Sequence, residues 1–197
     1  MLWSIYGQST NDDIGNGLFI GESLGAHYNY DFIGIWQADE AAEAASYGME
    51  VGQEKLRDVN NDGRYTAEDR VILGSPNPDW SGSIFTNLKV KNFDLSASLI
   101  ATQGVMVYSD FHSNFANTRD RGRQKLDINW YIPENDAGLA PQFSNSYPQP
   151  RNEGSFWRQD GVGYYRDASF VKVKNIALGY TFSDNTMEKL KLKKLIV

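Results

Sequence analysis

The sequence lacks cysteine and contains only two histidines among its 197 residues. Without a thiol the chain forms neither disulfide bonds nor thiolate metal sites, and it has no cysteine nucleophile. His27 and His112 lie far apart in the chain, and neither has an acidic or nucleophilic signature beside it. The glycine-containing stretches 15–17 and 161–163 lack the strand–loop–helix context of a phosphate-binding loop.

Paired carboxylates do not supply the missing catalytic chemistry. Asp12 and Asp13, like Asp39 and Glu40, are neighbours in the sequence. Neighbours on a strand point to opposite faces, so adjacency does not indicate a glycosidase acid and base. We therefore expect no enzymatic activity and no required cofactor.

Long apolar runs are absent as well. A membrane-spanning helix needs roughly 18 or more apolar residues in succession, and the chain has no such stretch, whereas a membrane-spanning strand needs only about ten alternating residues. The first 25 residues lack the basic start and apolar block of a secretion signal. We therefore expect no targeting segment in the sequence as given.

Positive charge is missing from residues 1–54, which contain no Lys or Arg. The whole chain has 19 Lys and Arg against 25 Asp and Glu, for a net charge of −6. So acidic a chain is not expected to bind nucleic acid. The lysine-rich end is expected to be a solvated strand edge or a rim near a membrane surface. Its lysines are Lys189, Lys191, Lys193 and Lys194.

Aromatic residues, by contrast, are abundant: 11 Tyr, 10 Phe and 5 Trp. Aromatic side chains favour strands over helices. The 18 Gly and 6 Pro are spread along the chain, which is typical of a fold with many turns. The composition therefore predicts an all-β fold.

Apolar and polar residues alternate with a period of two over residues 93–101 and again over residues 82–90. Such alternation indicates strands with one apolar face. Lys91 and Asn92 lie between the two stretches and predict a tight hairpin turn. We therefore expect two adjacent antiparallel strands here.

A third strand is predicted over residues 169–182. Its apolar residues share one face from Ile176 onwards, but Lys172 and Lys174 have the same parity in the sequence. Either a β-bulge near Asn175 or snorkelling of the lysine side chains is needed to keep that face apolar.

The remaining sequence predicts less regular structure. Residues 1–6 are interpreted as a strand remnant, residues 26–36 as one alternating strand and residues 38–49 as a short helix. Residues 105–168 form a long polar connection, which is usually functional or partly disordered. Its aromatic residues either stack on sugar rings, or pack the loop and line a membrane rim. They are Trp130, Tyr131, Phe143, Tyr147, Phe156, Trp157, Tyr164 and Tyr165.

Residues 58–69 contain the strongest local motif. Oxygen-bearing side chains recur at alternate positions 1, 3 and 5, Gly63 provides a sharp turn at position 6, and an acidic residue closes the loop at position 12. Ca²⁺ prefers such a set of oxygens. The candidate ligands are Asp58, Asn60, Asp62, Arg64 through its carbonyl, and Asp69. The alternative is an Asp/Asn-rich turn whose side chains bond their own backbone, since Asp69 replaces the usual longer Glu.

Characteristic motifs recur in order along nearly the whole chain. They are DIGNG (13–17), FIGE (19–22), YDFIGIWQ (30–37), Gly52, DVNNDG (58–63), DRVILG (69–74), PNPDW (76–80), KNFDL (91–95) and SFVKVKNIALGY (169–180). In these motifs the chain resembles the C-terminal part of SusC/RagA-type TonB-dependent outer-membrane transporters.

The resemblance implies a location in the cell outer membrane, in a barrel of about 22 strands plugged by an N-terminal domain. It also implies a SusD-like surface lipoprotein as partner, energy from the TonB complex, and import of oligosaccharides or peptides. On this interpretation residues 1–197 are antiparallel strands from one partial barrel domain, incomplete at both ends, with long extracellular loops and a short helix. Residues 58–69 would then lie in an extracellular loop, and the connection from Gln103 to Ser169 would reach toward substrate or lid.

Two other functions stay open at this point. A soluble carbohydrate-binding β-sandwich would bury the apolar strand faces against a second sheet. A calcium-dependent interaction module would instead use the loop of residues 58–69 to bind its partner.

Overall fold

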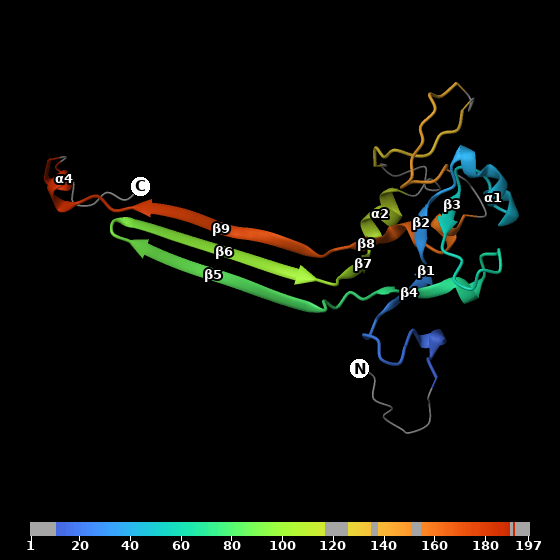
Figure 1. The fold of residues 1–197 in the computed structure, drawn as a ribbon, viewed down its shortest axis with the longest axis horizontal. Helices are drawn as coiled ribbons and strands as arrows, with labels where there is room; N and C mark the ends of the chain where they lie inside the picture. Colours follow the sequence, from blue (N-terminus) through green and yellow to red (C-terminus); the bar gives the residue numbers. More distant parts are fainter. Residues whose placement is uncertain (1–10, 117–125, 135–137, 151–154, 190, 192–197) are drawn as a thin grey trace. The chain divides into compact units, whose positions relative to one another are not determined.

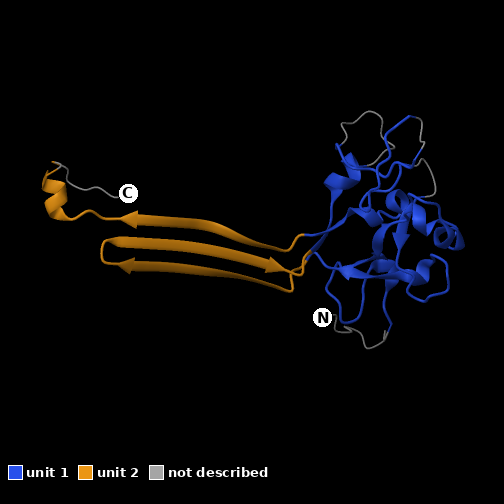
Figure 2. Ribbon diagram, turned by 45° about the horizontal axis from the view of Figure 1, so that its top comes forward, with its two compact units in different colours: residues 1–76, 106–167 blue, residues 77–105, 168–197 orange. Residues whose placement is uncertain are grey.

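A computed structural model of the chain describes residues 11–116, 126–134, 138–150, 155–189 and 191. The chain divides into two compact units (Figure 2). Unit 1 comprises residues 1–76 and 106–167, and unit 2 comprises residues 77–105 and 168–197. All strand pairs in the described part of the chain are antiparallel, and the helices are short, which confirms the expected fold class. The single partial barrel domain over residues 1–197 stays a prediction.

Unit 2 contains a three-stranded sheet of long strands (Figure 1). Strands β5 (Trp80–Val90), β6 (Phe93–Gln103) and β9 (Phe170–Tyr180) each have 11 residues and lie in the order β5-β6-β9. Val90 pairs with Phe93 across a two-residue turn, in which Lys91 has a φ of +55°. The predicted hairpin and third strand are confirmed.

The pairing of β6 with β9 contains an irregularity at the expected place. Ser98 and Leu99 are consecutive in β6, but they pair with Asn175 and Val173 in β9. Lys174 is therefore the extra residue of a β-bulge. Because one residue is added, the side-chain alternation of β9 changes parity at this point. This confirms the β-bulge, which was one of the two alternatives for the positions of the lysines.

Aligned side chains give this sheet two different faces. Lys172, which pairs with Ile100, lies on the face that is mainly polar or small. On the opposite face, Ile84 is 70% exposed and Val171 is 68% exposed. We call this opposite face the apolar face. Its large apolar residues are Ile84, Leu88, Val90, Phe93, Leu95, Leu99, Val171, Val173, Ile176 and Leu178.

Unit 1 is built from short strands. The prediction of one strand over residues 26–36 is wrong, because the chain bends at Asp31 and its two halves pair with different strands. Asp31 accepts a hydrogen bond from Arg57 N at its carbonyl and forms an ion pair with Arg57 through its carboxylate at 2.8 Å. The pairs are β1 (His27–Tyr30) with β4 (Arg70–Gly74), β2 (Phe32–Ile35) with β3 (Glu54–Leu56), and β7 (Met106–Tyr108) with β8 (Tyr165–Asp167).

The predicted helix over residues 38–49 is present but shorter. It consists of the 3₁₀ turn η2 (Ala38–Glu40) and helix α1 (Ala41–Ser46), and Gly48 follows with a φ of +70°. The other short helices are η1 (Ile14–Asn16), η3 (Ala67–Asp69), α2 (Asp110–Phe115), α3 (Phe156–Gln159), η4 (Val162–Tyr164) and α4 (Asp184–Lys189).

Parts of two predictions lie outside the residues described. The predicted strand remnant over residues 1–6 lies wholly outside them, and so do Lys193 and Lys194 of the lysine-rich end. Lys189 ends α4 rather than a strand edge, and Lys191 is exposed. Among the helices that the structure describes, none is long and apolar enough to cross a membrane.

Aromatic side chains form the core of unit 1. One cluster joins Tyr30, Leu56 and Val162, and a second joins Trp36 with Ala44 and Met49. A third cluster contains Ala116, Trp157 and Tyr164. Phe156 packs against the second cluster and Phe32 against the third, so both sequence segments of unit 1 contribute to each cluster.

Two single-residue deletions test the role of the β-bulge. Deleting Lys174 should leave both faces intact, because Val173 and Asn175 then alternate regularly. Deleting Val173 should instead place Lys174 on the apolar face, which costs roughly 2–4 kcal/mol in a membrane environment. In detergent solution, hydrogen exchange of the β6 amides should stay slow after the first deletion and become at least about tenfold faster after the second. Equal protection in both variants would contradict this account.

Candidate functional site

The long connection predicted over residues 105–168 is folded against the first segment of unit 1 by buried polar contacts. Glu54 in β3 is only 1% exposed, and one of its carboxylate oxygens accepts hydrogen bonds from Ser155 Oγ and Trp157 N, both at 2.8 Å. Asn29 Nδ2 donates to the carbonyl of Asp160 at 2.7 Å. The connection therefore has a defined structure in its described parts, because these contacts satisfy buried polar groups.

Most aromatic residues of this connection take part in packing. Tyr131, Trp157 and Tyr164 are 1%, 4% and 2% exposed, so the packing interpretation is confirmed for these three. Burial raises the pKa of Tyr164 to about 12, as expected for a phenol shielded from water. Phe143, at 56% exposed, is the member of the set that offers a large free surface.

The loop of residues 58–69 is organised around the carboxylate of Asp58. Its Oδ1 accepts from Asn61 N at 2.7 Å and from Asp62 N at 3.3 Å, while its Oδ2 accepts from Gly63 N at 2.9 Å and Tyr47 Oη at 3.1 Å. Desolvation acts to raise the pKa of Asp58, but these hydrogen bonds together outweigh it and hold the pKa below its usual value. Four donors match the four lone pairs of one carboxylate.

The other candidate ligands also bond within the loop. Asp62 Oδ1 accepts from Arg64 N at 2.9 Å, and Asn60 Oδ1 accepts from Asp62 N at 3.0 Å. Asp69 is fully buried and accepts from Val59 N at 2.9 Å and Thr66 N at 2.7 Å. The side chains thus bond the backbone of their own turn.

These bonds correspond to the Asp/Asn-rich turn that was the alternative interpretation of the motif. Gly63 has a φ of +78°, as the sharp turn at position 6 requires. Within the described ranges, no group of three or more His, Asp or Glu side chains has a metal-binding arrangement. The Ca²⁺ site itself stays a prediction.

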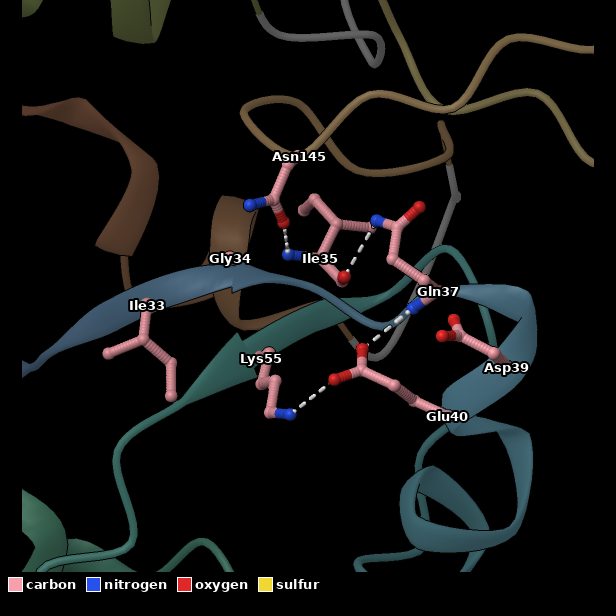
Figure 3. Close-up of a pocket in the computed structure, with 8 residues that line it drawn as sticks. All are labelled: Ile33, Gly34, Ile35, Gln37, Asp39, Glu40, Lys55 and Asn145. Carbon is pink, nitrogen blue, oxygen red and sulfur yellow. Dashed lines mark hydrogen bonds and ion pairs between the residues drawn. The ribbon is translucent and has the colours of Figure 1, made fainter.

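A separate cavity of about 470 Å³ lies in unit 1 beside β2 and the 3₁₀ turn η2 (Figure 3). We call it the β2 pocket. Side-chain amides shape one wall: Asn145 Oδ1 accepts from Ile35 N at 2.8 Å, and Gln37 Nε2 donates to Ile35 O at 2.8 Å. The pocket is lined by Ile33, Gly34, Ile35, Gln37, Asp39, Glu40, Lys55 and Asn145.

The charges of the β2 pocket are partly paired. Lys55 Nζ lies 2.7 Å from Glu40 Oε1 and 4.1 Å from the centre of the Trp36 ring. Glu40 Oε2 accepts from Gln37 N at 3.0 Å. The hydrogen bond from Lys55, followed by that from Gln37 N, holds the pKa of Glu40 below its usual value.

Sequence reasoning missed both Glu54 and this pocket. Asp39 and Glu40 are neighbours on a short 3₁₀ turn rather than on a strand, so the argument from opposite strand faces does not apply to them. Asn145 comes from the long connection, which carries no pattern that predicts its contact with β2. Of the site residues, the sequence pattern indicates only the alternating oxygen-bearing side chains of residues 58–69.

Comparison with known proteins finds relatives of one kind. No protein-family model matches the chain. TonB-dependent receptor P3 of Formosa agariphila is 28% identical over 88% of this chain and 16% of its own length. TonB-dependent receptor P26 of the same organism is 28% identical over 86% of this chain and 17% of its own length. TonB-dependent receptor SusC of Bacteroides thetaiotaomicron is 31% identical over 64% of this chain and 12% of its own length.

The chain therefore spans about a sixth of the length of the first two relatives. These similarities support a SusC-like TonB-dependent receptor and confirm the resemblance indicated by the motifs. TonB-dependent receptors are outer-membrane proteins, so the expected localisation is confirmed as well.

Removal of the Glu54 carboxylate tests how unit 1 is held together. Glu54→Ala should lower the free energy of unfolding of unit 1 by roughly 3 kcal/mol, since Ser155 Oγ and Trp157 N lose their buried acceptor. Glu43→Ala, at an exposed position of α1, is the control and should change it by less than about 0.5 kcal/mol. Urea denaturation followed by tryptophan fluorescence measures both. Equal effects would show that the buried carboxylate has no special role.

Proposed function

We propose that this chain is part of the wall and outer loops of a TonB-dependent outer-membrane transporter that imports oligosaccharides or peptides. The observation that supports this function best is the exposed apolar face of the β5-β6-β9 sheet. The similarity to SusC supports glycan uptake in particular. TonB-dependent receptors are transporters, and we propose no enzymatic activity.

Strand length favours a membrane wall over a soluble sheet. A strand of 11 residues is about 36 Å long, and when tilted it spans an apolar band about 25 Å tall. One side of each strand is apolar and the other is mainly small or polar, with Phe85, Ile100 and Phe170 as the large apolar exceptions. This is the pattern of a lipid-facing wall around a wet lumen. In water, a sheet face that exposes this many large apolar side chains would promote aggregation.

The outer edges of β5 and β9 indicate that the proposed barrel contains further strands. Within the described residues, neither edge pairs with a further strand. Lipid does not tolerate unpaired backbone groups, so the barrel requires strands beyond these three. We therefore propose that residues 1–197 work only within a larger barrel, and that this polypeptide alone transports nothing.

Two partners follow from the proposed function. A SusD-like surface lipoprotein would cover the extracellular side, and the TonB complex would supply the energy for import. The similarity to SusC supports both.

The alternative of a soluble carbohydrate-binding β-sandwich needs a second sheet on the apolar face. The described residues provide none there, and Ile176 and Leu178 are each 66% exposed. The membrane interpretation is therefore favoured.

Cell fractionation of the full parent gene product tests the proposed localisation and function. We expect recovery only from the outer-membrane fraction after detergent extraction, and TonB-dependent uptake of an oligosaccharide or peptide by cells that carry it. Recovery in a soluble supernatant without detergent would rule the transporter out.

Two arginine substitutions on neighbouring residues of β5 test which face meets lipid. In the parent protein, Ile84→Arg should cost roughly 2–4 kcal/mol of barrel stability, because Ile84 lies near mid-strand on the apolar face. Ser83→Arg on the opposite face is the matched control and should cost little. The readout is the fraction of heat-modifiable, folded barrel in isolated membranes. Equal loss in both variants would contradict a lipid-facing apolar face.

We also propose that the loop of residues 58–69 takes a structural Ca²⁺, on the strength of its oxygen spacing. The cation would share Asp58 and Asp69 with backbone amides, so we expect weak binding, with a Kd of about 10⁻⁴ to 10⁻³ M. Calorimetric titration should give saturable heat with wild type and none with Asp58→Ala. Absence of heat in both would leave only a turn. A calcium-dependent interaction module would further require loss of partner binding on chelation.

A further inference from the structure

We propose that the β2 pocket binds a positively charged, hydrogen-bond-donating group, namely an ammonium or guanidinium group such as the side chain of a basic peptide residue. The inference rests on the charges and shape of unit 1 and does not depend on the transport function. It concerns Asp39, which none of the preceding assignments uses.

Asp39 is the carboxylate of this pocket that is left to interact with a ligand. Among the residues that the structure describes, its side chain has no hydrogen-bond or ion-pair partner. Glu40, the next residue, uses one oxygen for Lys55 and the other for Gln37 N, so each of its oxygens keeps one lone pair. Both residues line the pocket and are labelled in Figure 3.

Lys55 does not neutralise both carboxylates of the pocket. Its ammonium group is paired with Glu40 at 2.7 Å and lies over the ring of Trp36. One positive charge against Asp39 and Glu40 leaves the pocket with a net charge of −1. Since residues 1–54 contain no Lys or Arg, that part of the chain supplies no internal cation to compete for Asp39.

The walls of the pocket are held in place before any ligand binds. Gly34 has a φ of +152°, and a Cβ at this position would lie 2.6 Å from Asn145 Oδ1, so only glycine allows this close approach. Gln37 Nε2 also donates to Ser144 O at 3.2 Å. A fixed set of polar groups around a cavity of a few hundred Å³ is typical of small-ligand sites.

Chemical complementarity selects a cation with an aliphatic stem. Ile33 is 47% exposed and offers apolar surface to methylene groups, while Asp39 accepts from the charged end. A sugar ring fits less well, because Trp36, the ring beneath Lys55, is only 1% exposed and has no free face. An anionic ligand would be repelled by the net charge.

Binding of the capped peptide acetyl-Gly-Lys-Gly-amide, whose single charge is the lysine ammonium, to the full chain in detergent solution tests the inference. We expect a saturable shift of the Trp36 indole resonance in nuclear magnetic resonance spectra. The affinity should fall at least fivefold in Asp39→Asn and less than twofold in Glu43→Gln, which removes the same charge from an exposed position of α1. Raising the salt concentration should weaken binding, because Asp39 is exposed to solvent and its charge is screened by salt.

The same peptide acetylated at the lysine Nε should give no saturable shift. The proposal is overturned if the lysine-acetylated peptide binds equally well, if Asp39→Asn binds like wild type, or if maltotriose saturates the pocket while the capped lysine peptide does not. None of these measurements involves membrane insertion or uptake, so their failure leaves the transport proposal unaffected. Failure of the transport proposal likewise leaves the cation-binding proposal unaffected.

Discussion

The period-two alternation of side chains in the β5-β6-β9 sheet is the constraint on which the rest of unit 2 depends. Three strands of 11 residues align their apolar side chains on one face, although Lys172 and Lys174 have the wrong parity in the sequence. The bulge at Lys174 resolves this conflict with one extra residue. Without it, either a charged side chain would enter the apolar face or the strand would slip and expose polar residues to it. The proposed lipid-facing role requires such continuity.

Unit 1 buries its apolar groups in a different way. Its strands have only three to five residues and cannot form a core by alternation alone. Aromatic side chains from two distant segments fill its interior instead, and buried polar groups such as Glu54 and Asn29 fix which segments meet. Because an unpaired buried polar group is costly, these contacts select one arrangement of the long connection. That arrangement also positions Asn145 against β2.

Carboxylates in unit 1 differ in whether the fold satisfies them. Asp58 and Asp69 accept backbone amides, and they hold the loop of residues 58–69 in its turn. Glu40 is paired with Lys55, whereas Asp39, one residue earlier, has no described partner. Acidic residues with similar sequence surroundings thus have different physical roles. The unpaired one faces a cavity, and this is why we infer a cationic ligand there.

Local pattern in the sequence determined the hairpin of β5 and β6, strand β9 and the parity conflict within it, for which a bulge and lysine snorkelling were both open, because side-chain alternation within one strand is a local property. It also marked residues 58–69, whose cited hydrogen bonds span no more than 11 positions. Tertiary structure alone decided that residues 26–36 break at Asp31 and that Tyr131, Trp157 and Tyr164 are packed rather than free. It likewise decided that Asn145 closes a pocket more than 100 positions away from its partner in the chain, Ile35. Those outcomes depend on contacts between distant segments, and no local periodicity encodes which distant polar group will satisfy a given buried one.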